Sequence, residues 1–183
     1  MIDALLAAPV AQGIGLLGTA CGMAWPLFRS RNGILLAQLA TNLFFTVHLL
    51  LLGAVTGALM NGLSAVQVAA AIPLGTRPGF RVVYLAVLPV VAAGLALTWH
   101  GVPSLFAAAG MALVSLSRYQ TDVRRLRLIM MLAFPCWFAH NLLVGSLPGV
   151  LSDVVGMTLN AAVLLRPLRD GRRRAIAARP GGA

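Results

Sequence analysis

The chain has 183 residues, of which 60% are hydrophobic and 10% charged, and its formal net charge is +10. Soluble domains usually carry about 25% charged residues, so this composition excludes an ordinary soluble domain and indicates an integral membrane protein. The positive charge does not indicate a nucleic-acid partner, because the arginines stand in short gaps between apolar segments of spanning length.

The apolar segments predict seven transmembrane helices. Most of them approach the roughly 20 residues that a helix needs to cross a bilayer. No basic residue precedes the first segment, which indicates a retained span rather than a signal peptide. A six-helix alternative stays open, because the fifth segment is short and its join to the fourth, "HGVP", is a weak break. In chain order the segments are 7–28, 33–52, 54–73, 82–99, 102–117, 127–145 and 148–166.

The arginines favour the seven-helix alternative. All 14 basic residues are arginine, and they fall in every second connection and in the C-terminal tail from Arg166. The connections at Gly53, "HGVP" and "GSLPG" contain none. Seven helices place every arginine on one side, whereas six would divide them between both sides. The positive-inside rule then predicts an external N-terminus and a cytoplasmic C-terminus.

The chain also contains an internal repeat. A shift of 92 residues aligns "FTVHLLLLGAVTGALMN", which begins at Phe45, with "WFAHNLLVGSLPGVLSD", which begins at Trp137. Because three helices are an odd number, one further helix between the two units restores a parallel orientation. We therefore predict an all-α membrane fold of 3+1+3 helices, with parallel repeats like those of some transporters. The divisions are 1–75, a linker-helix region at 76–101, 102–168, and a basic tail at 169–183 that we expect to be disordered and attracted to anionic lipids.

The repeat places polar side chains at mid-membrane depth. Trp137, His140 and Asn141 occupy positions i, i+3 and i+4 of one helical face. Asp153 is the only acidic residue inside a predicted span, where a carboxyl group is costly and by default functional. An aromatic plate beside hydrogen-bonding groups suits a polar ring. The candidate substrate-binding residues are Phe45, His48, Asn61, Trp137, His140, Asn141, Asp153 and Asn160.

Several motifs carry a family resemblance. "VAQGIG", "HLLLLG" and "WFAHNLLVGS", with Leu159 and Asn160, resemble the bacterial inner-membrane family typified by YgjV, over most of residues 10–168. The chain is more distantly similar to the SWEET and SemiSWEET sugar carriers and to the PnuC nicotinamide riboside carriers. The first resemblance implies a bacterial inner membrane, and the similarity to the carriers implies a 3+1+3 architecture and a carrier of sugars or nucleosides.

The SemiSWEET pattern implies roles for particular residues. Trp137, Pro148 and Asp153 match its Trp, Pro and Asn spacing, with Asp in place of Asn, and both ends of that pattern line the substrate cavity in the family. Pro26 resembles the proline of the family's first-helix hinge. Its glutamine is replaced by Leu27, and the second unit has no matching proline near Arg118, which weakens the analogy for that unit.

We therefore expect an alternating-access carrier for a small polar, ring-bearing solute. Asp153 would pair with a cationic group or take up a coupling proton. The alternatives are a non-transporting receptor or assembly protein, and a metal-ion carrier using the histidines and cysteines. No enzyme motif is evident, and the sequence predicts no cofactor and no resident metal. The expected partners are the solute, the bilayer and anionic lipids; self-association into a homo-oligomer stays open.

Overall fold

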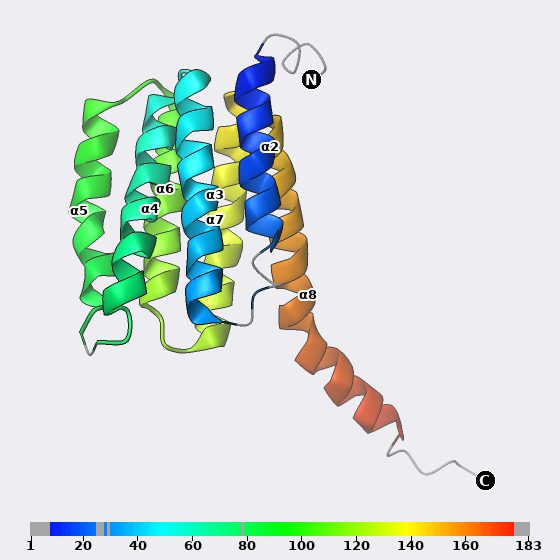
Figure 1. Cartoon of the computed structure of the whole chain (residues 1–183). Coiled ribbons are helices and arrows are strands. Elements are labelled where there is room, and N and C mark those ends of the chain that lie inside the picture. Colours follow the sequence, from blue (N-terminus) through cyan, green and yellow to red (C-terminus); the bar gives the residue numbers. More distant parts are fainter. Residues whose placement is uncertain (1–7, 25–27, 29, 78, 178–183) are drawn as a thin grey trace.

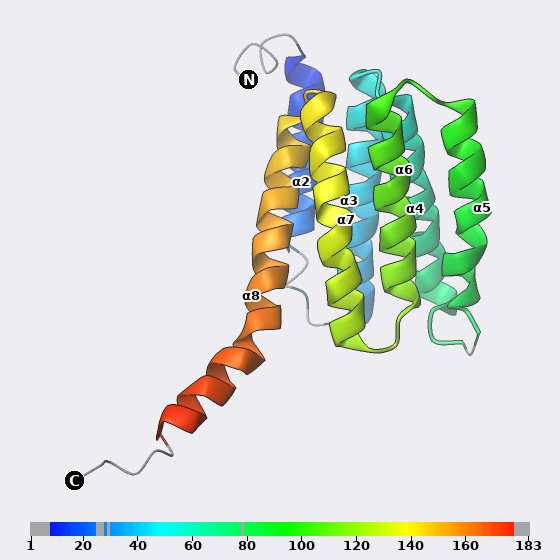
Figure 2. The ribbon, with the colours of Figure 1, turned by 180° about the vertical axis from the view of Figure 1, so that it is seen from behind.

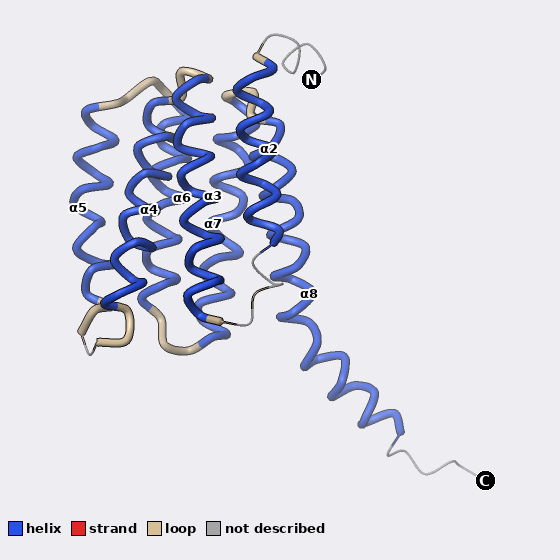
Figure 3. Tube along the Cα trace, in the orientation of Figure 1, coloured by secondary structure: helices blue, strands red, loops and turns tan. Residues whose placement is uncertain are grey.

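The fold is all-helical, as predicted, in the part of the chain that the computed structural model describes: residues 8–24, 28, 30–77 and 79–177. The helices run up and down in sequence order, and no strand occurs among them in Figure 3. They are α2 (Pro9–Ala24), α3 (Arg31–Leu51), α4 (Val55–Leu74), α5 (Val82–Leu97), α6 (Val102–Tyr119), α7 (Val123–Leu143) and α8 (Leu147–Ala177).

Local sequence signals explain where these helices start and stop. Ser30 accepts a hydrogen bond from the Gly33 N–H and caps α3, and Asp122 does the same for the Arg125 N–H of α7. Gly101 has φ 89° and separates α5 from α6, a conformation that glycine adopts without steric penalty. The weak break at "HGVP" is thus a true turn, and the two segments beside it are separate helices.

The helices pack as a ring with one helix outside it. α2, α3 and α4 pack in sequence order, as do α6, α7 and α8. The ring closes where α2 packs against α8 and where α4 packs against α6, while α5 packs on α4 and α6 at the edge of the bundle (Figures 1 and 2). The interpretation of this ring as two parallel bundles and a linker helix stays a prediction.

The bundle is apolar outside and partly polar inside, as lipid requires. On α3, Leu36, Leu43 and Leu50 recur every seven residues and are each more than half exposed. Gln12, Gln67 and Ser115 are buried instead, because an unpaired polar group in hydrocarbon costs several kcal/mol. Four described helices are long and apolar enough to cross a membrane, within Asn32–Leu51, Val55–Leu74, Arg124–Leu143 and Leu147–Leu165, and Val82–Leu97 is a shorter apolar helix. The protein is therefore multi-pass.

The basic connections gather at one end of the bundle. The α4–α5 and α6–α7 connections and the last turns of α8 lie at the bottom of Figure 1, and the α3–α4, α5–α6 and α7–α8 connections lie at the top. We call these the arginine end and the arginine-free end. The expectation of a disordered tail is wrong for residues 169–177, which continue α8 to Ala177. Residues 178–183 and the hinge candidate Pro26 lie outside the described residues.

We predict that the arginine end faces the cytoplasm, because cytoplasmic connections retain arginine. Thr76 and Trp99 are exposed at opposite ends of α5. In a background with Cys21 and Cys136 replaced by serine, a membrane-impermeant maleimide is added to intact spheroplasts, where it reaches only the external side of the membrane. It should label Trp99→Cys. Thr76→Cys should be labelled only after the membrane is permeabilised. The reverse labelling pattern would mean the opposite orientation, and labelling of both would mean that α5 does not span.

Candidate functional site

The interior of the bundle contains a cavity of about 600 Å³. Its lining comes from α2, α3, α4, α6, α7 and α8, and the peripheral helix α5 contributes nothing to it. Six of the eight residues predicted to bind substrate line this cavity: Phe45, Asn61, Trp137, Asn141, Asp153 and Asn160. The candidate site is therefore central and is shared by helices from both halves of the chain.

The cavity runs along the bundle toward the arginine end. Trp137 and Arg127 both line it from α7, and their separation of ten positions corresponds to about 15 Å along a helix axis. Phe45 lines it from α3, in the other half of the chain. Aromatic groups thus lie toward one end of the cavity and guanidinium groups toward the other.

The one carboxyl group in the lining is held by an amide. Asn141 donates from Nδ2 to Asp153 Oδ2 at 2.8 Å, and both residues are buried. Asn141 Oδ1 is buried and has no hydrogen-bond partner. The pair joins α7 to α8 and leaves one amide oxygen that can still accept a hydrogen bond. Asn61, by contrast, donates to the Gly57 carbonyl oxygen of its own helix at 3.1 Å.

The two histidines that were predicted to bind substrate, His48 and His140, do not line this cavity. His48 Nδ1 lies 2.7 Å from the Ala11 carbonyl oxygen, and Nε2 lies 2.7 Å from Ser146 Oγ. Because a carbonyl only accepts, Nδ1 carries the proton, and a neutral ring then accepts at Nε2 from the serine. Full burial and two partners give His48 a structural position, joining α2, α3 and the start of α8.

The second half repeats this geometry at a separation of 92 residues. His140 Nδ1 lies 2.9 Å from the Pro103 carbonyl oxygen, and Ala11 and Pro103 are equivalent positions. Each histidine also meets an aromatic edge three residues earlier, Phe45 or Trp137, with ring centroids 5.8 Å apart in both pairs. The turns that follow contain Gly53 with φ 73° and Gly145 with φ 72°. The sequence repeat is therefore also a repeat of contacts.

The two halves differ at the second ring nitrogen, Nε2, of the histidine. His140 Nε2 is buried and has no hydrogen-bond partner. The residue equivalent to Ser146 is Ala54, which has no hydroxyl group to offer. The ring also packs directly against Gly57, where an added Cβ would overlap it. The missing partner thus follows from one amino-acid difference between the two halves.

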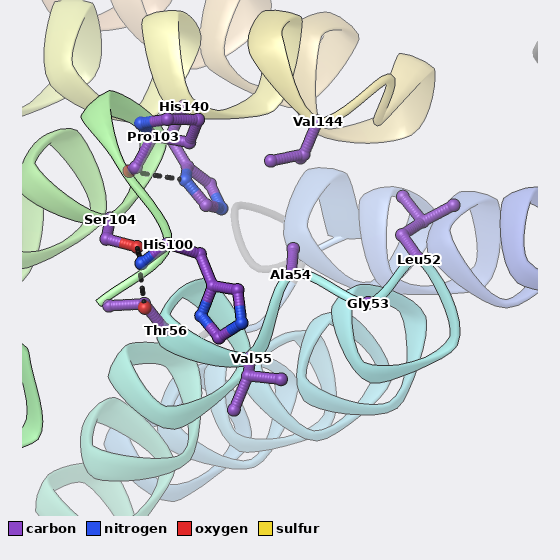
Figure 4. Close-up of a pocket in the computed structure, with 10 residues that line it drawn as sticks. All are labelled: Leu52, Gly53, Ala54, Val55, Thr56, His100, Pro103, Ser104, His140 and Val144. Carbon is purple, nitrogen blue, oxygen red and sulfur yellow. Dashed lines mark hydrogen bonds between the residues drawn. The ribbon is translucent and has the colours of Figure 1, made fainter. Parts of the chain in front are cut away.

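A smaller pocket of about 150 Å³ lies beside this nitrogen at the arginine-free end. Figure 4 shows His140 and His100 in the wall of this pocket, together with Gly53 and Ala54 of the α3–α4 turn. Ser104 links its walls, because its Oγ lies 2.9 Å from Thr56 Oγ1 and accepts from the His100 N–H at 3.0 Å. This pocket is separate from the lining of the central cavity.

Sequence reasoning missed the two arginines that line the cavity, Arg118 and Arg127, because it interpreted every arginine as a topology signal. Arg118 donates from Nη1 to Gln67 Oε1 at 2.8 Å and to Ser64 Oγ at 3.1 Å. Arg127 donates to Asn160 Oδ1 at 3.0 Å. The polar stripe of Asn61, Ser64 and Gln67 in an apolar segment was the available signal, since those groups need partners inside the bundle.

Among the described residues, no group of three or more His, Cys, Asp or Glu side chains is placed to hold a metal ion. Cys21 and Cys136 are free thiols.

Comparison with known proteins gives one match. Residues 9–170 match a family model, Imp-YgjV, described as bacterial inner membrane protein. No curated protein and no solved structure matches the chain.

We predict that Ala54→Ser stabilises the protein, because it places a hydroxyl group beside His140 as Ser146 does beside His48. The gain should be about 0.5–1.5 kcal/mol, the usual net value of one hydrogen bond. Ser146→Ala is the mirror variant and should lower stability, since it leaves His48 Nε2 unpaired. Thermal unfolding in detergent measures both. A lower melting temperature for Ala54→Ser would show that the two turns are not equivalent.

Proposed function

The chain belongs to the Imp-YgjV family of bacterial inner membrane proteins, and we propose that it is an alternating-access carrier for a small polar, ring-bearing solute such as a sugar or nucleoside. The observation that carries this proposal is the central cavity, whose wall combines aromatic, amide and charged side chains from both halves of the chain. Sites formed at the interface of parallel repeats are typical of one class of secondary transporters.

The hydrogen bonds between the two halves support a carrier whose α2–α8 seam is closed at one end. At the arginine-free end, Gln12 Nε2 donates to the Gly145 carbonyl oxygen at 2.8 Å, and His48 contacts Ser146, which closes the α2–α8 seam. The α4–α6 seam is bonded toward both ends, by Thr56 with Ser104 here and by Arg118 with Gln67 nearer the arginine end. The cavity instead extends toward the arginine end. With that end in the cytoplasm, this arrangement corresponds to an inward-facing state.

The lining residues suit a polar ring. Trp137 and Phe45 come from opposite halves and offer aromatic surfaces, while Asn61, Asn141 and Asp153 offer hydrogen-bonding groups at similar depth. Rings with polar edges bind in this way, with dispersion at the face and hydrogen bonds at the rim. Asp153 would bind a coupling proton or a cationic group of the solute.

Counterflow into liposomes tests the proposal most directly. Purified protein is reconstituted with unlabelled solute inside, and uptake of the labelled solute is measured for a panel of sugars, nucleosides and vitamins. We expect saturable uptake of at least one ring-bearing solute. A receptor with the same cavity would bind a solute without moving it, so binding without counterflow would contradict the carrier proposal.

We predict that Trp137→Ala weakens solute binding by about tenfold, because removal of one stacking surface costs about 1–3 kcal/mol. The matched control is Trp99→Ala, since Trp99 is half exposed and lies outside the cavity lining. Affinity is measured by ligand-induced thermal shift in detergent. Equal affinities for the two variants would place the ring-binding surface elsewhere.

We also predict that Asp153→Asn leaves the protein folded but removes the pH dependence of counterflow between about pH 5 and 8. Asparagine keeps the shape and an oxygen that accepts from Asn141, yet it cannot exchange a proton. Asp122→Asn is the control, because Asp122 is exposed and caps α7 at the arginine end. If Asp153→Asn and the parent respond to pH alike, the carboxyl group has a structural role.

A further inference from the structure

The charges in the cavity wall are unbalanced at the arginine end. Arg118 lines the cavity from α6 and Arg127 from α7, and Asp153 is the one acidic residue in the lining. The hydrogen-bond partners of both guanidinium groups are neutral: Ser64, Gln67 and Asn160. Two cations thus border the same space without a carboxylate among their bonded partners, and charges inside a membrane protein are retained mainly where they serve a function.

The neutral partners orient the guanidinium groups and, among the described residues, use only part of their donors. Each bond described for these side chains uses Nη1 alone, whereas a guanidinium carries five N–H donors. Gln67 is itself held by Ser115 at 3.0 Å, so Arg118 is fixed by a buried network rather than by a single contact. A planar guanidinium with unused donors fits the paired oxygens of a carboxylate or phosphate.

Other arginines of the same connection lack these features. Arg124 and Arg125 are exposed on the first turn of α7 and do not line the cavity. They satisfy the positive-inside rule equally well, so topology does not require Arg118 and Arg127 to face the interior. The inward position of these two side chains places their guanidinium groups on the cavity wall.

We propose that Arg118 and Arg127 bind the anionic group, a carboxylate or phosphate, of a solute whose ring lies beside Trp137 and Phe45. This inference rests on the proposed carrier function and narrows its substrate class to ring-bearing anions. Trp137 and Arg127 lie ten residues apart on α7, roughly 15 Å along the helix axis, which suits a solute with its ring and anionic group at opposite ends. The phosphate of an anionic lipid shares this chemistry and is the competing source of the anion.

Matched neutral and anionic probes test the inference on the full chain in a neutral detergent. The pairs are uridine with uridine 5′-monophosphate and adenosine with adenosine 5′-monophosphate, and inorganic phosphate is a third probe. We expect the anionic member of at least one pair to bind more tightly and to compete in counterflow. Arg127→Gln should weaken its binding by about tenfold to a hundredfold. Arg125→Gln removes the same charge from the same helix and should change it little.

A second variant separates folding from binding. Arg127→Lys keeps the charge and should bind the anion with an intermediate affinity, because an ammonium group lacks the paired donors. Melting temperatures of the ligand-free variants show whether each one is folded.

The outcomes are distinguishable. If a neutral solute gives saturable counterflow that Arg127→Gln does not change, and no anionic probe competes, this inference is wrong and the carrier proposal stands. If phosphatidylglycerol in nanodiscs stabilises the parent but not Arg127→Gln, relative to phosphatidylcholine, and no soluble anion binds, the site takes lipid and the inference is also wrong. Absence of counterflow for every solute, neutral or anionic, contradicts the carrier proposal itself.

Discussion

In each half of the chain, one imidazole N–H that donates to a carbonyl oxygen of the preceding helix fixes how the first two helices pack. His48 bonds to Ala11 and His140 bonds to Pro103. Both bonds are inside the bundle, where no lipid atom can replace the partner. The bonds orient the rings, the rings meet Phe45 and Trp137 edge-on, and these aromatic side chains then form part of the cavity wall. The cavity thus depends on two residues that do not line it.

The same constraint decides which side chains surround the cavity. In lipid the outer surface can be apolar, so there is little reason to bury hydrophobic residues rather than polar ones. Leucines accordingly occupy the exposed stripe of α3, while amides, hydroxyl groups and guanidinium groups turn inward and bond to one another. A polar interior of this kind joins the helices, and where the side chains leave space it becomes a site for a polar solute.

Sequence reasoning predicted the helices well, because hydropathy, the arginine spacing and the turn glycines all report on the bilayer. It also identified six residues that line the cavity, since the repeat and the helical spacing of Trp137, Asn141 and Asp153 place them on one side of α7 and α8. It did not distinguish the histidines, because a buried imidazole held by a carbonyl and one held by a solute look alike in a sequence. The inward arginines were missed for a related reason. Whether an arginine at a helix end points into the bundle depends on partners such as Gln67, from a helix far away in the sequence.

The differences between the two halves matter as much as their similarity. Asp153, Arg118 and Arg127 all lie in the second half, and the residues 92 positions earlier, Asn61, Pro26 and Leu35, carry no charge. In the proposed carrier, the second half therefore makes every charged contact with the solute, and the first half contributes Phe45 and neutral amides. When the two halves move relative to each other, the charged groups of the site move together as one body. The solute's charge would then stay with its partners, while the hydrogen bonds that close the arginine-free end, such as that of Gln12 with Gly145, break for that end to open.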